Sequence, residues 1–161
     1  MSISSEMHIE RLNEILRKKK ILLQDILVLT KNQSQTITED GIESLQKLIS
    51  DKQLKIDEID KLDDEFSVYF HRLKTVLNVS SLDELSVSGV AGAKQLRGLT
   101  KDILKLIADI SEIEKQNNRN SKELLGQLGS EIKKINQGKK VNNAYIPNMP
   151  NTVSYFIDKK K

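Results

Sequence analysis

The side chains that could carry out chemistry in this chain are few and scattered. None of the 161 residues is cysteine, which excludes disulfides, thiolate metal ligands and cysteine nucleophiles. The two histidines, His8 and His71, stand in separate segments with no motif beside them, and no glycine-rich phosphate loop or nucleophile elbow occurs. The acidic groups at 57–60 and 63–65 lack the loop spacing and the turn glycine of an EF-hand. The sequence therefore predicts no enzyme active site, no metal site and no cofactor.

Apolar residues that recur on a seven-residue cycle dominate the chain instead. This spacing gives a helix one narrow apolar seam that must press against other helices. In the second of three such stretches the series is broken only by Lys52 and Asp63, and it consists of Ile42, Leu45, Ile49, Ile56, Ile59, Phe66, Phe70, Leu73 and Leu77. In the first stretch Lys19, Thr30 and Gln33 occupy weak positions among Ile9, Leu12, Leu16, Leu23, Ile26 and Ile37. Such a chain is built to hold helices, its own or those of another protein.

The breaks between these stretches predict where the helices begin and end. Thr36 and Glu39 have the spacing of a capping box, as do Ser81 and Glu84, which are expected to open one short helical turn. We expect long helices over about 5–37, 40–77 and 93–137. The first connection is short, so the second helix should run antiparallel to the first. The predicted fold is all-α, an elongated antiparallel helical bundle or coiled coil of three long helices.

The third helix changes character along its length. Its heptad series runs through Leu96, Leu99, Ile103, Leu106, Ile110 and Ile113, and its next two positions are Asn117 and Asn120. Leu124, Leu128, Ile132 and Ile135 then continue at altered spacing, with glycines at 126 and 129 that lower helix propensity. Two interpretations of the asparagines stay open. They fix the register of a buried seam, or they open that seam to a partner.

Composition and charge narrow the class of protein. Apolar content of 37% with 30% charge is typical of a narrow helical core, and the chain lacks an apolar run long enough to span a bilayer. The start of the chain has no signal-peptide pattern, so we expect a soluble cytoplasmic protein without membrane insertion. The basic balance comes from the end of the chain, where five lysines oppose one aspartate after residue 135. A nucleic-acid partner is disfavoured because no ordered element carries a basic stripe.

The last part of the chain has its own pattern. We expect the helical bundle to cover 1–138 and a flexible, extended or disordered tail to cover 139–161, which contains Pro147 and Pro150 and has no apolar period. Tyr145, Tyr155 and Phe156 place large apolar groups in this tail, where no core would bury them. We interpret them as a short linear docking site.

Several of these segments together resemble a known family. They are 42–53, 56–63, Phe66, the region of Asn117, Lys139-Lys140, Tyr145 and 156–160. In this layout of long helix, short acidic turn, second helix and lysine-rich aromatic tail, nearly the whole chain resembles the FlgN-type flagellar export chaperones, particularly those of Gram-positive bacteria.

The resemblance implies a cytoplasmic chaperone of flagellar type III secretion. Such a chaperone binds the C-terminal helical segments of hook-associated (hook–filament junction) proteins, prevents their premature assembly and delivers them to the cytoplasmic domain of the export gate. Carried onto this chain, the substrate contacts are Leu124, Leu125, Leu128, Ile132 and Ile135, with Asn117 and Asn120 at the start of the surface. Tyr145, Tyr155 and Phe156 become candidates for docking to the gate or for closing over substrate.

A structural or scaffolding coiled coil without a chaperone role is the main alternative. It predicts that the end of the third helix is buried in a homodimer and that the tail is dispensable. Binding of nucleic acid through the lysine-rich end is a further alternative, which predicts a steep dependence on salt. Homo-oligomer formation stays open, because three helices can close within one chain or exchange seams between copies.

Overall fold

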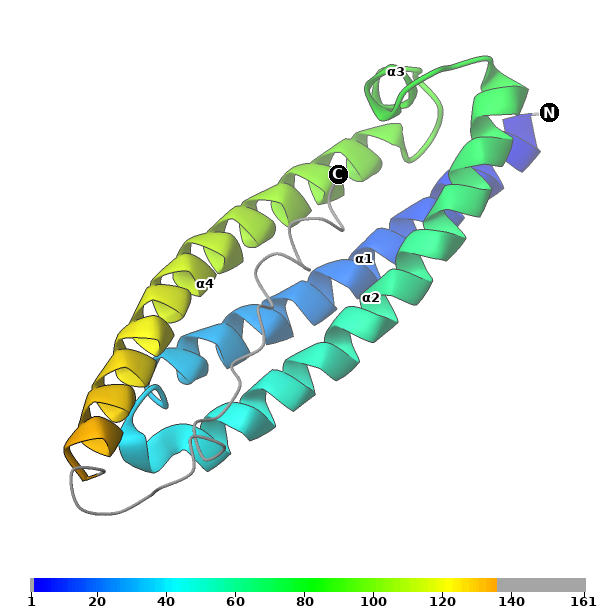
Figure 1. Ribbon diagram of the computed structural model, residues 1–161. Coiled ribbons are helices and arrows are strands. Elements are labelled where there is room, and N and C mark those ends of the chain that lie inside the picture. The colour runs from blue at the N-terminus through cyan, green and yellow to red at the C-terminus, as the bar shows by residue number, and fades with distance from the viewer. Residues whose placement is uncertain (1, 136–161) are drawn as a thin grey trace. The chain divides into compact units, whose positions relative to one another are not determined.

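The computed structural model describes residues 2–135, and within them every regular element is helical (Figure 1). The elements are α1 (Ser2–Ser34), the 3₁₀ turn η1 (Glu39–Gly41), α2 (Ile42–Leu77), α3 (Leu82–Ser86) and α4 (Ala93–Ile135). The prediction of an all-α fold with three long helices is confirmed. The segment expected to form a tail lies outside the described residues.

The contacts divide the chain into two compact units. Unit 1 comprises residues up to Leu27 together with Gln53–Ala108, and unit 2 comprises Val28–Lys52 together with the residues from Asp109 onward. Each unit therefore takes one segment from each of the three long helices and has its own core.

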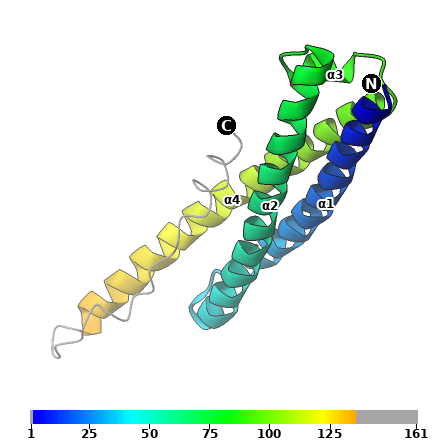
Figure 2. The same ribbon diagram turned by 90° about the vertical axis from the view of Figure 1, so that its right-hand side faces the viewer.

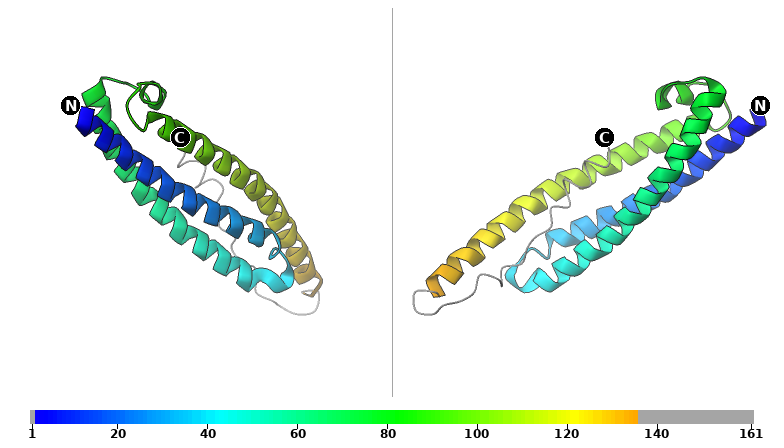
Figure 3. Two further views of the ribbon diagram at one scale, coloured as in Figure 1. Left: turned by 180° about the vertical axis from the view of Figure 1, so that it is seen from behind. Right: turned by 45° about the vertical axis from the view of Figure 1, so that its right-hand side comes forward.

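The core of unit 1 follows the predicted seams of the first two helices. The α1 positions of the series are buried, and Ile56, Ile59 and Leu73 of α2 are buried with them, while Phe66, Phe70 and Leu77 of the α2 series are half-buried. Ion pairs between Arg11 and Glu65 (2.9 Å) and between Asp25 and Lys55 (3.4 Å) show that α1 and α2 run antiparallel, as expected. Figure 3 shows the N-terminal part of α1 lying along the C-terminal part of α2.

Two of the weak seam positions in unit 1 compensate each other. Lys19 of α1 is 6% exposed and its ammonium lies 2.7 Å from the carboxylate of Asp63 on α2. Both residues interrupt apolar series in the sequence. The interruption is therefore matched across the two helices, because a buried charge is tolerated when it is paired.

The connection between α1 and α2 differs from the predicted one. α1 ends at Ser34 rather than near Ile37, and the Thr36 hydroxyl donates to the Gln33 carbonyl at 2.8 Å. The N-cap residue of η1 is Thr38, whose side chain makes no capping bond. The expected capping box of Thr36 and Glu39 is wrong because Thr36 closes the first helix instead of opening the second.

The connection between α2 and α4 contains the predicted short helix, which lies between these two helices in Figure 2. The Glu84 backbone N–H donates to the Ser81 hydroxyl at 3.2 Å, as a capping box requires. The Glu84 carboxylate accepts from the backbone N–H and hydroxyl of Ser80, and these bonds lower the pKa of Glu84. Gly92, at φ +90°, lies so close to Ile9 that a Cβ atom would come within 2.9 Å of that side chain.

The buried face of α4 is rotated from the expected one. Half of the predicted series is buried, namely Leu96, Ile103, Ile110 and Asn117, while Leu99, Leu106, Ile113 and Asn120 are only half-buried. Their places in the seam are taken by Ile107, Glu114 and Ser121. The buried positions then continue to Leu124 in steps of three and four residues. The change of spacing after Asn120 is therefore not a change in the buried face of the helix.

Candidate partner-binding surface on α4

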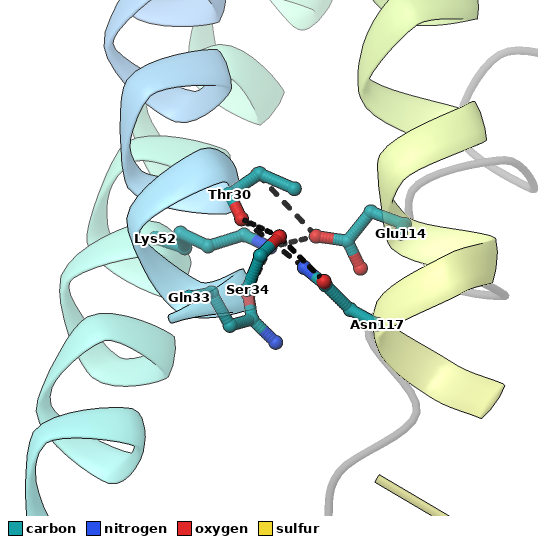
Figure 4. A network of polar contacts seen from close by, with 6 residues as sticks. All are labelled: Thr30, Gln33, Ser34, Lys52, Glu114 and Asn117. Atoms are coloured by element: carbon teal, nitrogen blue, oxygen red, sulfur yellow. Dashed lines mark hydrogen bonds and ion pairs between the residues drawn. The ribbon is translucent and has the colours of Figure 1, made fainter. Parts of the chain in front are cut away.

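A layer of polar side chains crosses the core of unit 2. Its members come from all three long helices and are Thr30, Gln33 and Ser34 of α1, Lys52 of α2, and Glu114 and Asn117 of α4, and all of them except Ser34 are buried (Figure 4). We refer to these six residues as the polar layer. It includes Asn117, the first of the α4 residues that the sequence singled out for a partner.

Lys52 is the centre of the polar layer. It is 1% exposed, and its ammonium donates to the Glu114 carboxylate and, at 2.9 Å, to the Gln33 side-chain carbonyl. Glu114 is 4% exposed and also accepts from the Thr30 hydroxyl at 3.4 Å. Burial lowers the pKa of Lys52 to about 7, while the adjacent carboxylate favours the charged ammonium. The two effects oppose each other, because burial destabilises the charged ammonium and the Glu114 carboxylate stabilises it.

Asn117 extends the polar layer toward the end of α1. Its amide nitrogen donates to the Thr30 backbone carbonyl at 3.1 Å, and its side-chain oxygen accepts from the Ser34 hydroxyl at 2.7 Å. Asn117 is 2% exposed. Of the two interpretations of this residue, the observed bonds correspond to an internal contact that fixes one position of α4 against α1.

Beyond the polar layer, the apolar side chains of α4 become progressively more exposed. Leu124 is 6% exposed and belongs to the seam. Leu125, Leu128 and Ile132 are half-buried, and Ile135 is 56% exposed. These four share one side of the helix, because their spacing is three, four and three residues. We call them the distal stripe.

The end of α4 faces an acidic neighbour in the turn between α1 and α2. Glu131 lies close enough to Glu39 for its like charge to raise the pKa of Glu39. Asp40 adds to the same effect. A like-charge pair favours separation, so the electrostatics at this point weaken the hold of the turn on α4.

The other predicted residues fall as follows. Asn120 is half-buried, and its side-chain oxygen accepts a bond from Gln116 of the same helix at 3.1 Å. Tyr145, Tyr155 and Phe156 lie outside the described residues. The sequence analysis missed Glu114, because it stands beside the expected apolar series. A helical spacing of three and four residues could have identified Glu114, because it continues unbroken through positions 107, 110, 114, 117 and 121. Apolar residues occupy the first two of these positions and polar residues the last three.

Elsewhere in the described chain, residues 87–101 line an open depression of about 690 Å³. A shallow depression of about 390 Å³ between α1 and α2 is lined by Lys18, Ile21, Leu22 and Leu62, among others. Residues 2–135 contain no group of three or more histidine, aspartate or glutamate side chains placed to hold a metal ion. Within the same range, no helix is both long and apolar enough to cross a membrane.

Comparison with known families decides the class of protein. The family model described as FlgN protein matches residues 7–149, which cover most of the chain. The chain belongs to the FlgN family. No curated protein and no solved structure matches it. FlgN proteins are flagellar export chaperones rather than enzymes, so a long helix with an accessible apolar stripe is the kind of element that such a protein needs.

Proposed function

We propose that this FlgN protein is a cytoplasmic chaperone that binds the C-terminal helical segments of hook-associated proteins before their export. The observation that carries the proposal is the distal stripe. It places four large aliphatic side chains on one side of α4, of which Leu125, Leu128 and Ile132 are half-buried and Ile135 is exposed. An amphipathic substrate helix can cover such a stripe by packing its own apolar face against it.

The other predicted substrate contacts on α4, Asn117, Asn120 and Leu124, differ in their accessibility. Asn120 lies at the start of the surface and is half-buried, so its amide is within reach of a bound helix. Leu124 is buried, and a substrate reaches it only when this part of α4 moves, whereas Asn117 is buried and bonded to Thr30 and Ser34 of α1. Ile135 is exposed without such a movement, whereas Leu125, Leu128 and Ile132 are half-buried.

Binding would protect the substrate and leave it releasable. Covering the stripe removes apolar surface of both helices from water, which favours the complex by about 25 cal/mol per Å² before the cost of association. A substrate helix held in this way cannot use the same face for premature assembly. We further propose that Tyr145, Tyr155 and Phe156 dock to the cytoplasmic domain of the export gate, which would deliver the loaded complex.

Two matched substitutions test the substrate surface. Ile135 and Leu104 both lie on α4 and are each 56% exposed, but only Ile135 belongs to the distal stripe. Calorimetry with the C-terminal segment of a hook-associated protein should give a Kd about tenfold higher for Ile135→Ser, which corresponds to about 1.4 kcal/mol. Leu104→Ser should leave the Kd unchanged.

The contrary outcomes are equally defined. Equal effects of the two substitutions would remove the stripe from the interface. A wild-type chain that binds no such segment, and instead forms a stable homodimer through α4, would favour the structural coiled-coil alternative.

A further inference from the structure

We propose that the polar layer is a positioning device that holds α4 in one register and orientation, so that a partner displaces only the segment of α4 after it. We call this segment, residues 118–135, distal α4. The identity of the partner rests on the proposed function. The positioning of α4 by the polar layer does not depend on it.

The bonds of the polar layer are specific to one position of α4. Lys52 contacts two different helices, donating to Gln33 of α1 and to Glu114 of α4. Asn117 makes one donor and one acceptor bond to α1. A shift of α4 by one helical turn would break these bonds and leave Lys52 and Glu114 as unpaired buried charges. Apolar layers do not discriminate in this way, since Leu and Ile can repack against several neighbours.

Distal α4 is packed less tightly than the part of α4 at the polar layer. The exposed fraction of the side chain is 6% at Leu124 and 56% at Ile135. Glycines at 126 and 129 contribute no side chain to packing and lower helix propensity. The like-charge pair of Glu39 and Glu131 opposes close approach of the turn and the helix. These features lie on one side of the polar layer and all act in the same direction.

Distal α4 is therefore an arm that the polar layer anchors at one end. The bonds of the polar layer determine which side of α4 faces the α1–α2 segments of unit 2, and therefore which side the distal stripe occupies. Movement that begins at the exposed end of α4 stops where it meets Lys52, Glu114 and Asn117. A partner then gains a defined surface without unfolding the core of unit 2.

Spin-label distances test this in the full chain, which has no native cysteine. Ser44 of α2, Glu112 of α4 and Ser130 of α4 are all exposed and belong to unit 2. One labelled pair, S44C/E112C, reports on α4 before the layer, and another, S44C/S130C, reports on distal α4. We expect a narrow distance distribution for the first pair and a broader one for the second.

Two further variants test the polar layer and distal α4 independently of each other. K52L/E114L makes the centre of the layer apolar, and should broaden or split the distribution of the first pair while helical circular dichroism is retained. E39K replaces the like-charge pair with an attractive one, and should narrow the distribution of the second pair only. Should K52L/E114L fail to fold, Asn117→Leu removes two bonds to α1 and should broaden the first pair in the same sense.

The results that would overturn the inference are distinct from failure of the proposed function. If the first pair keeps its narrow distribution when the layer is apolar, the layer does not position α4. If both pairs are equally narrow in the wild type, distal α4 is not an arm. Adding a hook-associated C-terminal segment should shift the second pair and leave the first unchanged. If the label distances are as expected but the added segment does not bind, the positioning role of the polar layer stands. The proposed substrate is then wrong.

Discussion

The ion pair of Lys52 and Glu114 should show strong coupling when its two members are replaced singly and together. The residues are 1% and 4% exposed, so removing one partner leaves the other as a buried charge without its opposite charge. We expect Lys52→Met and Glu114→Leu each to lower the free energy of unfolding by about 3 to 5 kcal/mol. Glu114→Leu should fall at the lower end, because burial already lowers the pKa of Lys52 to about 7 and the lysine can lose its proton.

The double substitution K52M/E114L should behave differently. It removes both charges and fills the layer with apolar side chains of similar size, so its stability should lie within about 1 kcal/mol of the wild type or above it. The assay is urea unfolding at pH 7 followed by circular dichroism, with midpoints and slopes compared across the four proteins. The more exposed pair of Arg11 and Glu65, with side chains 34% and 46% exposed, is the control and should couple by about 1 kcal/mol or less.

The reasoning would be refuted by additive effects. If each single change costs less than about 1 kcal/mol and the double change equals their sum, Lys52 and Glu114 do not form a desolvated pair. A changed slope in the single variants would instead indicate that unit 2 no longer unfolds with the rest of the chain.

Two more predictions concern pH and the first turn. Because burial lowers the pKa of Lys52 from 10.5 to about 7, the unfolded chain binds more protons than the folded one between these values, and stability should rise with pH over this window. Urea midpoints at pH 7 and 9 should show the wild type gaining about 1 to 2 kcal/mol relative to K52M/E114L, and an unchanged difference would contradict the assignment. Gly41→Ala would place a Cβ atom 2.3 Å from the Thr36 carbonyl oxygen. It should destabilise the chain by about 2 kcal/mol in a thermal melt, whereas Gly98→Ala, which meets nothing within 4 Å, should be neutral or stabilising.

The sequence was sufficient for part of the seams of α1 and α2, but Ile15 and Leu22 are buried outside the predicted series, and Phe66 and Phe70 of the predicted series are only half-buried. Leu12, Leu23, Leu45 and Leu73 were all assigned to the core and all are fully buried. On α4 the outcome was different. Leu106 and Ile107 are adjacent and equally apolar, so two seams of similar hydropathy were available, and only packing against the other helices selects the one that contains Ile107.

The polar positions show the same limit more clearly. Lys52 and Asp63 looked like interruptions, but each has a partner on another helix, Glu114 for the first and Lys19 for the second. A single helix cannot reveal such a pair, because its members are far apart in the sequence and meet only when the helices are placed in register. The end of α1 was missed for a local reason, since the Thr36 hydroxyl can bond either forward or backward along the chain, and it bonds to Gln33.

Hydrogen exchange of the full chain, with and without the C-terminal segment of a hook-associated protein, tests the central claim most directly. The account predicts that amides of distal α4 exchange readily in the free chain and become protected on binding, while amides around Lys52 and Glu114 are protected in both states. If distal α4 is already protected in the free chain and the segment changes nothing, this part of α4 is internal core, and the proposed binding surface is wrong.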